Sequence, residues 1–375
     1  MTLLIDGEAG IVIANPDEQE LSEFDSRLAE ADRELDALQS NPSDPSSIAT
    51  CQTLDGMEIT LYGNVGLSSD LDQVLAHGLA GVGLFRTEFL YLQSEHRPDT
   101  DSQRRIYAKM YDRLGDRPLV IRTFDLGGDK LPPFLSKDEN VDASSLSLRG
   151  LRFSLAEKDL LRSQLNAIVQ VAQQADVSVL FPMVIGGHDF AQAIAMVDDV
   201  VEASNAFRRP QIGAMIETPA ALFCLDEILE LADFIAIGTN DLTQYLLAAD
   251  REHSAESDQV TAMHPAVLRA IHQIVSAAKR WDRPICVCGE EAGDPEFAEL
   301  LIGLGIRELS VSVSRSESLR KAIAHIDSTK ACDLVQRAQD CRSPNEVREL
   351  LRSAKQAEKL EDSDSRPIDA IKACS

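Results

Sequence analysis

The chain has 375 residues, of which 44% are hydrophobic, enough for one large α/β domain with appendages. Its formal net charge of −26 argues against nucleic-acid binding through a basic surface. No apolar run approaches the ~20 residues that span a bilayer, and no signal-peptide pattern is present, so we expect a cytoplasmic protein that binds no membrane. The seven scattered cysteines form no disulfide framework.

The first fifty residues are expected to lie outside the main domain. Residues 1–15 have the pattern of a strand, a glycine turn and a second strand, which is too little to fold alone. Apolar residues then recur every three or four positions over 16–40, which predicts a helix. A Ser/Pro-rich loop follows, so residues 16–50 are interpreted as a linker helix and loop.

From residue 57 onward, short apolar runs alternate with helical patterns. Eight strands are predicted at 58–62, 81–85, 118–123, 177–183, 211–216, 234–238, 284–288 and 308–313. The main helical patterns lie at 150–175, 188–206, 219–231, 265–280 and 295–304. Eight βα units over residues 51–330 predict a (β/α)8 TIM barrel. A doubly wound open sheet stays open as an alternative, because strand order cannot be derived from one sequence.

The C-terminal segment, residues 331–375, contains one helical pattern at 344–358. Its last residues are polar and charged, and we expect them to form a disordered tail.

Chemically apt side chains occur at the ends of five of the eight predicted strands. They are Arg86, Arg122, Glu217, the pair Asn240 and Asp241, and Cys288. In a TIM barrel the C-terminal strand ends meet at one face, which is where ligands bind. Five such residues at matching strand ends are hard to explain by chance, so we expect them to form one polar site at that face.

The residue types indicate an anionic substrate and a divalent metal. Arg86, Arg122 and Arg251 suit a phosphate or a carboxylate, because the guanidinium fork matches both. Glu217 and Asp241 supply carboxylate oxygens of the kind that Mg²⁺ takes. Cys288 could act as an acid or a nucleophile. The pattern does not decide whether Cys286 or Cys288 faces the site.

Other candidate motifs are weaker. Residues 127–130 (GGDK) are only a faint phosphate-loop signal, and no Walker or GxGxxG motif occurs. The seven histidines show no metal-binding spacing, and none lies in a context typical of a phosphohistidine. His264 directly precedes Pro265, so we expect it to cap or pack at a helix start.

Six motifs in this order carry a family resemblance: FRTEFLY, RTFDLGGDK, MIETPAAL, IGTNDLTQYLLAADR, HPAVL and CGEEAGDP. Over roughly residues 1–350 the chain resembles the C-terminal phosphoenolpyruvate-binding barrel of enzyme I of the phosphotransferase system, the phosphoenolpyruvate–protein phosphotransferases. The resemblance implies that Arg86, Arg122, Asn240 and Arg251 contact phosphoenolpyruvate, and that Glu217 and Asp241 hold Mg²⁺. It also implies that Cys288 protonates C3 of the enolate.

The resemblance further implies that the phosphoryl acceptor is a histidine on a domain absent from this sequence. Residues 1–15 would then be a remnant of that phosphohistidine domain. The implied partners are phosphoenolpyruvate and pyruvate, the phosphocarrier HPr through the missing half, and a second copy of the chain in a homodimer.

One segment departs from the family pattern. Where the family usually has NPxLGWRGIR, this chain has SSLSLRGLR, which keeps the arginine as Arg149. Arg149 and Asp241 are therefore further candidates for substrate binding. Two alternatives stay open. One is a fragment of a pyruvate phosphate dikinase or phosphoenolpyruvate synthase, and the other is a non-catalytic barrel that senses phosphoenolpyruvate.

Overall fold

The chain divides into two compact units, Met1–Ser47 and Ile48–Ser375. The computed structural model describes residues 3–6, 11–17, 20, 21, 24, 48, 49, 51–127, 131–136, 148–249 and 259–364. The boundary between the units lies close to the one that the sequence predicts at residue 50.

The first unit contains the predicted strand pair. Strand β1 (Leu3–Asp6) pairs antiparallel with β2 (Ile11–Ala14). Asp17 and Glu20 then form a reciprocal capping box, because each backbone N–H donates to the other's carboxylate, at 2.9 and 2.8 Å. This is the expected start of the predicted linker helix, most of which lies outside the described residues. The assignment of residues 1–15 to a phosphohistidine domain stays a prediction.

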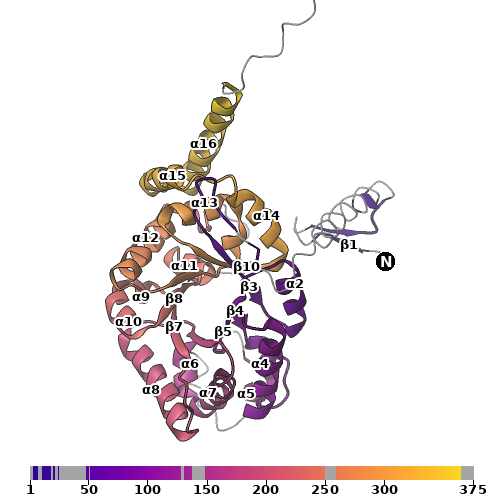
Figure 1. Ribbon diagram of the computed structural model, residues 1–375, viewed down its shortest axis with the longest axis vertical. Coiled ribbons are helices and arrows are strands. Elements are labelled where there is room, and N and C mark those ends of the chain that lie inside the picture. The colour runs from indigo at the N-terminus through magenta and orange to yellow at the C-terminus, as the bar shows by residue number, and fades with distance from the viewer. Residues whose placement is uncertain are drawn as a thin grey trace, which may run out of the picture. The chain divides into compact units, whose positions relative to one another are not determined.

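The second unit is the predicted TIM barrel. Its strands are β3 (Thr60–Val65), β4 (Val82–Arg86), β5 (Leu119–Arg122), β6 (Val177–Phe181), β7 (Gln211–Ile216), β8 (Phe234–Ile237), β9 (Ile285–Val287) and β10 (Glu308–Ser312). All neighbours are parallel, and β10 pairs with β3 to close the barrel (Figure 1). This closure excludes the open doubly wound sheet.

Helices surround the strands as a second layer (Figure 1). They are α2 (Leu71–Ala76), α3 (Glu88–Leu92), α4 (Thr100–Leu114), α5 (Pro133–Ser136), α6 (Leu151–Ala156), α7 (Lys158–Ala172), α8 (Gly187–Ala203), α9 (Pro219–Phe223), α10 (Leu225–Leu231), α11 (Thr239–Leu246), α12 (Pro265–Arg280), α13 (Pro295–Leu304) and α14 (Val313–Ile323). Two helices predicted as continuous are each broken in two. The backbone leaves the helical region at Glu157, with ψ +58°, and at Cys224, with ψ +23°. The apolar spacing continues across both breaks, so the sequence does not reveal them.

Apolar side chains fill the barrel in two separate clusters. The larger cluster lies between the strands and the helices. The smaller one contains Leu84, Leu180, Met215, Ala236 and Cys288. Its members come from β4, β6, β7 and β8, and from the residue after β9. The smaller cluster is the side-chain packing that fills the interior of a TIM barrel, and it supports the floor of the C-terminal mouth.

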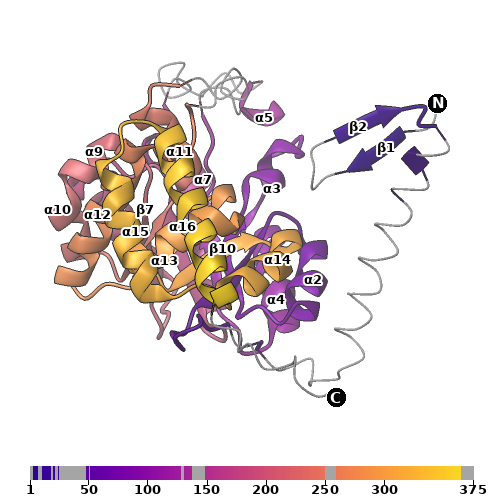
Figure 2. The same cartoon turned by 90° about the horizontal axis from the view of Figure 1, so that it is seen from above.

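Two helices follow the barrel, whereas the sequence predicts only one. They are α15 (Ser328–Asp340) and α16 (Pro344–Asp364), and Figure 2 shows them beside α12 and α13. Helix α15 packs so closely on α13 that a Cβ on Gly303 would lie 2.2 Å from the Ala331 carbonyl oxygen. The helical layer therefore continues past the predicted boundary at residue 330. The sequence predicts a disordered tail from residue 361. The structure corrects its start, because residues 361–364 continue helix α16, and residues 365–375 lie outside the described residues.

Within the described residues, no helix combines the length and the apolar character that crossing a bilayer requires.

Candidate functional site

A cavity of about 180 Å³ opens at the C-terminal mouth of the barrel. Its lining includes six of the predicted site residues, namely Arg86, Arg122, Glu217, Asn240, Asp241 and Cys288. They come from the ends of β4, β5, β7, β8 and β9, as the strand-end pattern predicts. Arg251 lies outside the described residues, so its predicted role stays a prediction.

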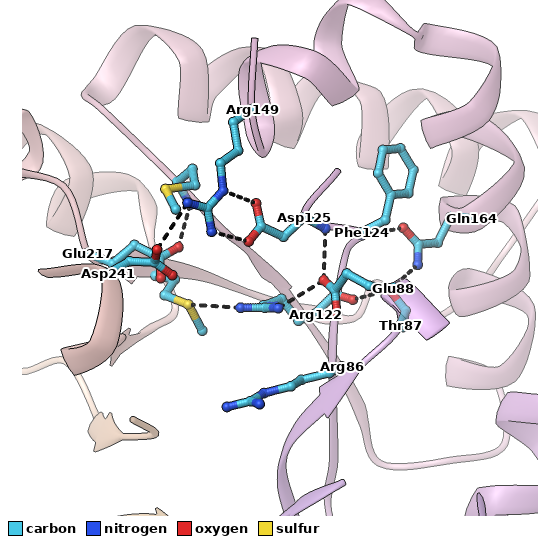
Figure 3. Close-up of polar contacts among 12 residues, drawn as sticks. Arg86, Thr87, Glu88, Arg122, Phe124, Asp125, Arg149, Gln164, Glu217 and Asp241 are labelled. Atoms are coloured by element: carbon cyan, nitrogen blue, oxygen red, sulfur yellow. Dashed lines mark hydrogen bonds and ion pairs between the residues drawn. The ribbon is translucent and has the colours of Figure 1, made fainter. Parts of the chain in front are cut away.

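Arg122 is the most firmly held cation of the cavity. It is 8% exposed, and its Nη2 lies 2.9 Å from Glu88 Oε1 (Figure 3). Glu88 Oε1 also accepts the backbone N–H of Asp125 at 2.8 Å. Burial alone would lower the pKa of Arg122, but Glu88, Asp125 and Glu217 together raise it above its ordinary value. Arg122 is therefore a permanent positive charge, and its buried Nε has no hydrogen-bond partner within the described part of the chain.

Arg86 is the more accessible cation. Its side chain is 31% exposed, and Nη1 lies 3.6 Å from Glu290 Oε1, at a partly solvated rim where ion pairs are weak. Strand β4 and helix α3 are separated only by Thr87, so the arginine lies at the turn between them. A ligand anion can replace Glu290 as its partner at little cost.

Two buried carboxylates face these arginines across the cavity. Glu217 Oε1 accepts the Met183 N–H at 2.7 Å, and burial together with the charge of Asp241 raises the pKa of Glu217 to about 8. Asp241 is 7% exposed, and its buried Oδ1 has no hydrogen bond from the described residues. A Cβ on Gly238 would lie 2.4 Å from Glu217 Oε2, so only glycine fits there. The two carboxylates repel each other, which a bound cation would relieve.

These carboxylates fit Mg²⁺ as a shared site rather than as a complete protein cage. Among the described residues, no group of three or more His, Cys, Asp or Glu could hold a metal ion. Mg²⁺ commonly takes one or two protein carboxylates and completes its shell with waters and substrate oxygens. Asp241 Oδ1 accepts no hydrogen bond from the described residues, although it lies 3.1 Å from Arg149 Nη1. This and the raised pKa of Glu217 are both consistent with that arrangement.

Arg149 lies between the two halves of the site. It donates to both oxygens of Asp125, with Nη2 2.9 Å from Oδ2 (Figure 3). Its Nη1 donates to the Tyr245 hydroxyl at 2.9 Å. The same Nη1 lies 3.1 Å from Asp241 Oδ1 without hydrogen-bond geometry. Burial would lower the pKa of Arg149, but Asp125 and Asp241 raise it. Arg149 thus partly neutralises a predicted metal ligand.

The backbone beside Arg149 depends on a glycine. Gly127 has a φ of +106° and forms an isolated antiparallel bridge with Arg149. A Cβ at this position would lie 1.9 Å from the Leu148 carbonyl oxygen. Gly127 thus allows two backbone segments to pack closely. It is the only residue of the predicted GGDK loop that the structure describes, because residues 128–130 lie outside the described residues.

Cys288 is the cysteine that lines the cavity at the C-terminal mouth. It is 2% exposed, and its Sγ donates to the Ile237 carbonyl oxygen at 3.5 Å. Burial, followed by the charge of Glu217, raises its pKa to about 12, so it is protonated at neutral pH. This suits a proton donor better than a nucleophile. Cys286 lies two residues earlier and lines a different cavity, at the N-terminal mouth.

Two smaller predictions can be checked here. Asn240 lines the cavity, and its Oδ1 accepts the Glu290 N–H at 3.0 Å, which ties the end of β8 to the turn after β9. His264 caps α12, because its Nδ1 accepts the Ala266 N–H at 3.1 Å. The capping prediction is confirmed.

Sequence reasoning missed four residues of the polar network around the site: Glu88, Asp125, Gln164 and Tyr245. Glu88 and Asp125 lie inside motifs already singled out, two and three residues after a site arginine. Gln164 had a subtler signal, because it is a polar residue on the apolar face of α7 between Leu161 and Leu165. Tyr245 had none.

A closed parallel barrel with arginines, two buried carboxylates and a protonated thiol at its C-terminal mouth defines an α/β-barrel protein with a site for a small anion. Residues 43–328 match the family model for the phosphoenolpyruvate-binding domain of phosphoenolpyruvate-utilising enzymes, and the chain belongs to this family.

The relatives refine this assignment. The chain is 36% identical over 359 residues to a phosphoenolpyruvate-protein phosphotransferase of Haloferax volcanii, covering 93% of this chain and 60% of that protein. It is 33% identical to a protein of the same name from Latilactobacillus sakei, covering 93% of this chain and 61% of the relative. A multiphosphoryl transfer protein of Rhodobacter capsulatus is 38% identical, with 93% of this chain and 41% of that protein covered. The resemblance to phosphoenolpyruvate–protein phosphotransferases is confirmed, and the chain spans well under two thirds of these relatives.

Proposed function

We propose that this chain is the phosphoenolpyruvate-binding half of a phosphoenolpyruvate–protein phosphotransferase. The single observation that carries the proposal is the C-terminal cavity, where Arg86 and Arg122 face Glu217, Asp241 and Cys288. Phosphoenolpyruvate carries a phosphate and a carboxylate, so its binding needs two cationic contacts. Its reaction needs positive charge to stabilise the enol oxygen and a proton for C3. The cavity offers a group for each need.

The arginines bind and orient the substrate. Arg122 is rigidly held and has a free buried Nε–H among the described contacts, while Arg86 can exchange Glu290 for a ligand anion. Phosphoryl transfer depends mainly on positioning and on neutralising charge. Asn240 lies at the same rim and supplies an amide N–H to a substrate oxygen, and Arg251 is proposed as a further contact.

Glu217 and Asp241 hold Mg²⁺ in this proposal. When bound, the metal supplies positive charge beside the anionic groups of the substrate. Asp241 Oδ1 accepts no hydrogen bond from the described residues, and the charge of Asp241 contributes to the raised pKa of Glu217, so both carboxylates would gain from a bound cation. Arg149 is held by Asp125 and Tyr245, and these contacts do not depend on Asp241.

The reaction moves one phosphoryl group and one proton. The bond between phosphorus and the enol oxygen breaks, and phosphorus forms a bond to a histidine nitrogen on a domain outside this sequence. The remaining enolate takes a proton at C3 from the Cys288 thiol, which gives pyruvate and a thiolate. The thiolate regains a proton from solvent. Arg122 and Arg86 lower the pKa of Cys288 slightly, which favours this transfer.

We propose that the acceptor comes from another domain, since none of the histidines in the described residues lines the cavity. We propose HPr as the next phosphoryl acceptor after that histidine. Phosphoenolpyruvate with HPr should therefore leave HPr unlabelled when this chain is the only enzyme. Addition of a separately expressed phosphohistidine domain should restore slow labelling. Robust labelling by this chain alone would contradict the proposal.

Calorimetry tests the central claim. Phosphoenolpyruvate should bind in the presence of Mg²⁺ and bind much more weakly in its absence. Asp241→Ala should lose most of the Mg²⁺-dependent affinity with little loss of stability. Tight binding without metal would count against Glu217 and Asp241 as ligands, and no binding under either condition would count against the whole proposal.

We also propose a homodimer. The net charge of −26 opposes association at low ionic strength, and screening shortens that repulsion to ~8 Å near physiological salt. Sedimentation should show the dimer favoured by added salt. A monomer at every salt concentration would refute the homodimer.

A further inference from the structure

One glutamine connects the two strands that carry the site arginines. Gln164 lies on α7 and is fully buried. Its Oε1 accepts the backbone N–H of Phe124 at 3.1 Å, and its Nε2 donates to Thr87 Oγ1 at 3.0 Å (Figure 3). The Nε2 also lies 3.2 Å from the Tyr107 hydroxyl. Every polar atom of the side chain therefore has a partner.

The two backbone positions that Gln164 contacts are next to the arginines. Thr87 directly follows Arg86, and its hydroxyl donates to the Arg122 carbonyl oxygen at 2.9 Å. Phe124 lies two residues after Arg122. One side-chain amide thus holds the ends of β4 and β5 together at the point where each strand presents its arginine.

Burying a primary amide among apolar side chains is costly unless each polar atom is satisfied. The neighbouring positions on this face of α7 are Leu160, Leu161, Leu165 and Ile168, all buried. A leucine or methionine would fill the same space without this cost. The amide gains its partners only from the strand ends and from Tyr107, so its use lies in fixing those strand ends.

We propose that Gln164 is a positioning residue that sets the spacing of Arg86 and Arg122, and thereby the affinity of the site for its anionic substrate. This inference rests on the proposed function. Gln164 itself does not line the cavity, so it acts through Thr87 and Phe124. A change at Gln164 should alter phosphoenolpyruvate affinity out of proportion to its effect on stability.

The chain offers a matched control in Gln103. This glutamine lies on α4, is 1% exposed, and accepts hydrogen bonds from the Tyr91 and Tyr107 hydroxyls at 2.9 and 3.1 Å. Its Nε2 donates to the Pro98 carbonyl oxygen at 3.1 Å. It is as buried and as well bonded as Gln164. It shares the Tyr107 hydroxyl with Gln164, but none of its own contacts reaches the ends of β4 or β5.

The experiment measures phosphoenolpyruvate binding to the full chain by calorimetry with Mg²⁺, together with urea midpoints. Gln164→Met should raise Kd about tenfold or more, because small misplacements of binding groups are expensive. Gln103→Met should change Kd less than about twofold at a similar shift in midpoint. Equal changes in Kd for the two variants would overturn the inference.

A second variant keeps the inference testable if Gln164→Met does not fold. Thr87→Val conserves shape and removes the hydroxyl that joins Gln164 to the Arg122 carbonyl. It should also raise Kd, and the double variant should lose less affinity than the sum of the two single losses, because both break the same link. Strict additivity would overturn the inference. Failure of the unaltered chain to bind would instead overturn the proposed function, and this inference with it.

Discussion

The two mouths of the barrel are built from the same eight strands, yet they differ in what balances their acidic groups. At the C-terminal mouth, Arg86, Arg122 and Arg149 lie among the carboxylates. At the N-terminal mouth, a cavity of about 200 Å³ contains Glu308 and Cys286, and no arginine or lysine is among its described lining residues. The two mouths therefore differ in whether cationic side chains line the cavity beside the acidic ones.

The largest expected contrast in substrate affinity is between two arginines, one at the end of β5 and one just before its start. Arg122→Met should weaken phosphoenolpyruvate binding about 100-fold, because it removes a buried charge that no water can replace. Calorimetry with Mg²⁺ measures the loss. The control is Arg117, which precedes β5, is 6% exposed, and donates to the Leu79 carbonyl oxygen at 3.0 Å. Arg117→Met should lower stability and leave affinity within about twofold. Equal losses of affinity would show that the effect is not specific to the functional mouth.

The second contrast is between two thiols, Cys286 on β9 and Cys288 directly after it. Cys288→Ser should still bind phosphoenolpyruvate and, with a donor phosphohistidine domain, still transfer the phosphoryl group. The enolate it releases should become pyruvate without stereocontrol, because a hydroxyl is a much weaker acid than a thiol. The measurement is the chirality of pyruvate formed in deuterated water from C3-labelled substrate. Cys286→Ser should keep the stereochemistry and lose stability. Stereocontrol that survives in the Cys288 variant would contradict its role as the acid.

Glu308 gives the smallest effect, and it concerns stability alone. Burial raises its pKa above the ordinary 4.5. Between 4.5 and that raised pKa, the folded state binds more protons than the unfolded state, so the stability contribution of this group falls as pH rises through the window. Glu308→Gln should remove this fall and stabilise the chain at neutral pH. Urea unfolding from pH 4.5 to 8 measures it.

Binding serves as the internal control for Glu308→Gln. Because the residue lies at the N-terminal mouth, phosphoenolpyruvate affinity should be unchanged. An identical pH dependence in the variant and the unaltered chain would mean that this carboxyl is not buried as described.

Much of the fold could be predicted from local pattern. Most barrel strands are short apolar runs, and five of them end at a polar residue that shows where the strand stops. Eight βα units predicted the barrel, but an open sheet stayed an alternative, because closure depends on pairing between β10 and β3, which no local signal encodes. The breaks at Glu157 and Cys224 were hidden by apolar spacing that continues through them.

The site was predictable in its residues and not in its connections. Arg122 and Asp241 were found from their places at strand ends. The network around them was not, because its hydrogen bonds join distant residues: Gln164 reaches Thr87 across 77 residues and Arg149 reaches Tyr245 across 96. The residue pattern alone did not separate Cys286 from Cys288, and only the family resemblance assigned the acid to Cys288. The two cysteines are only two residues apart, and their different depths within the barrel place them at opposite mouths.

The pairing of β3 with β10 has a consequence for synthesis. Thr60 is paired with Glu308, and the two are separated by 248 residues (308 minus 60). At translation rates of about 5–20 residues per second, the edge of β3 stays without its partner for roughly 12–50 s. An unpaired parallel edge of this kind can recruit other chains. The nascent barrel therefore passes through a period in which this edge is unpaired, and the period ends only when β10 emerges and the ring closes.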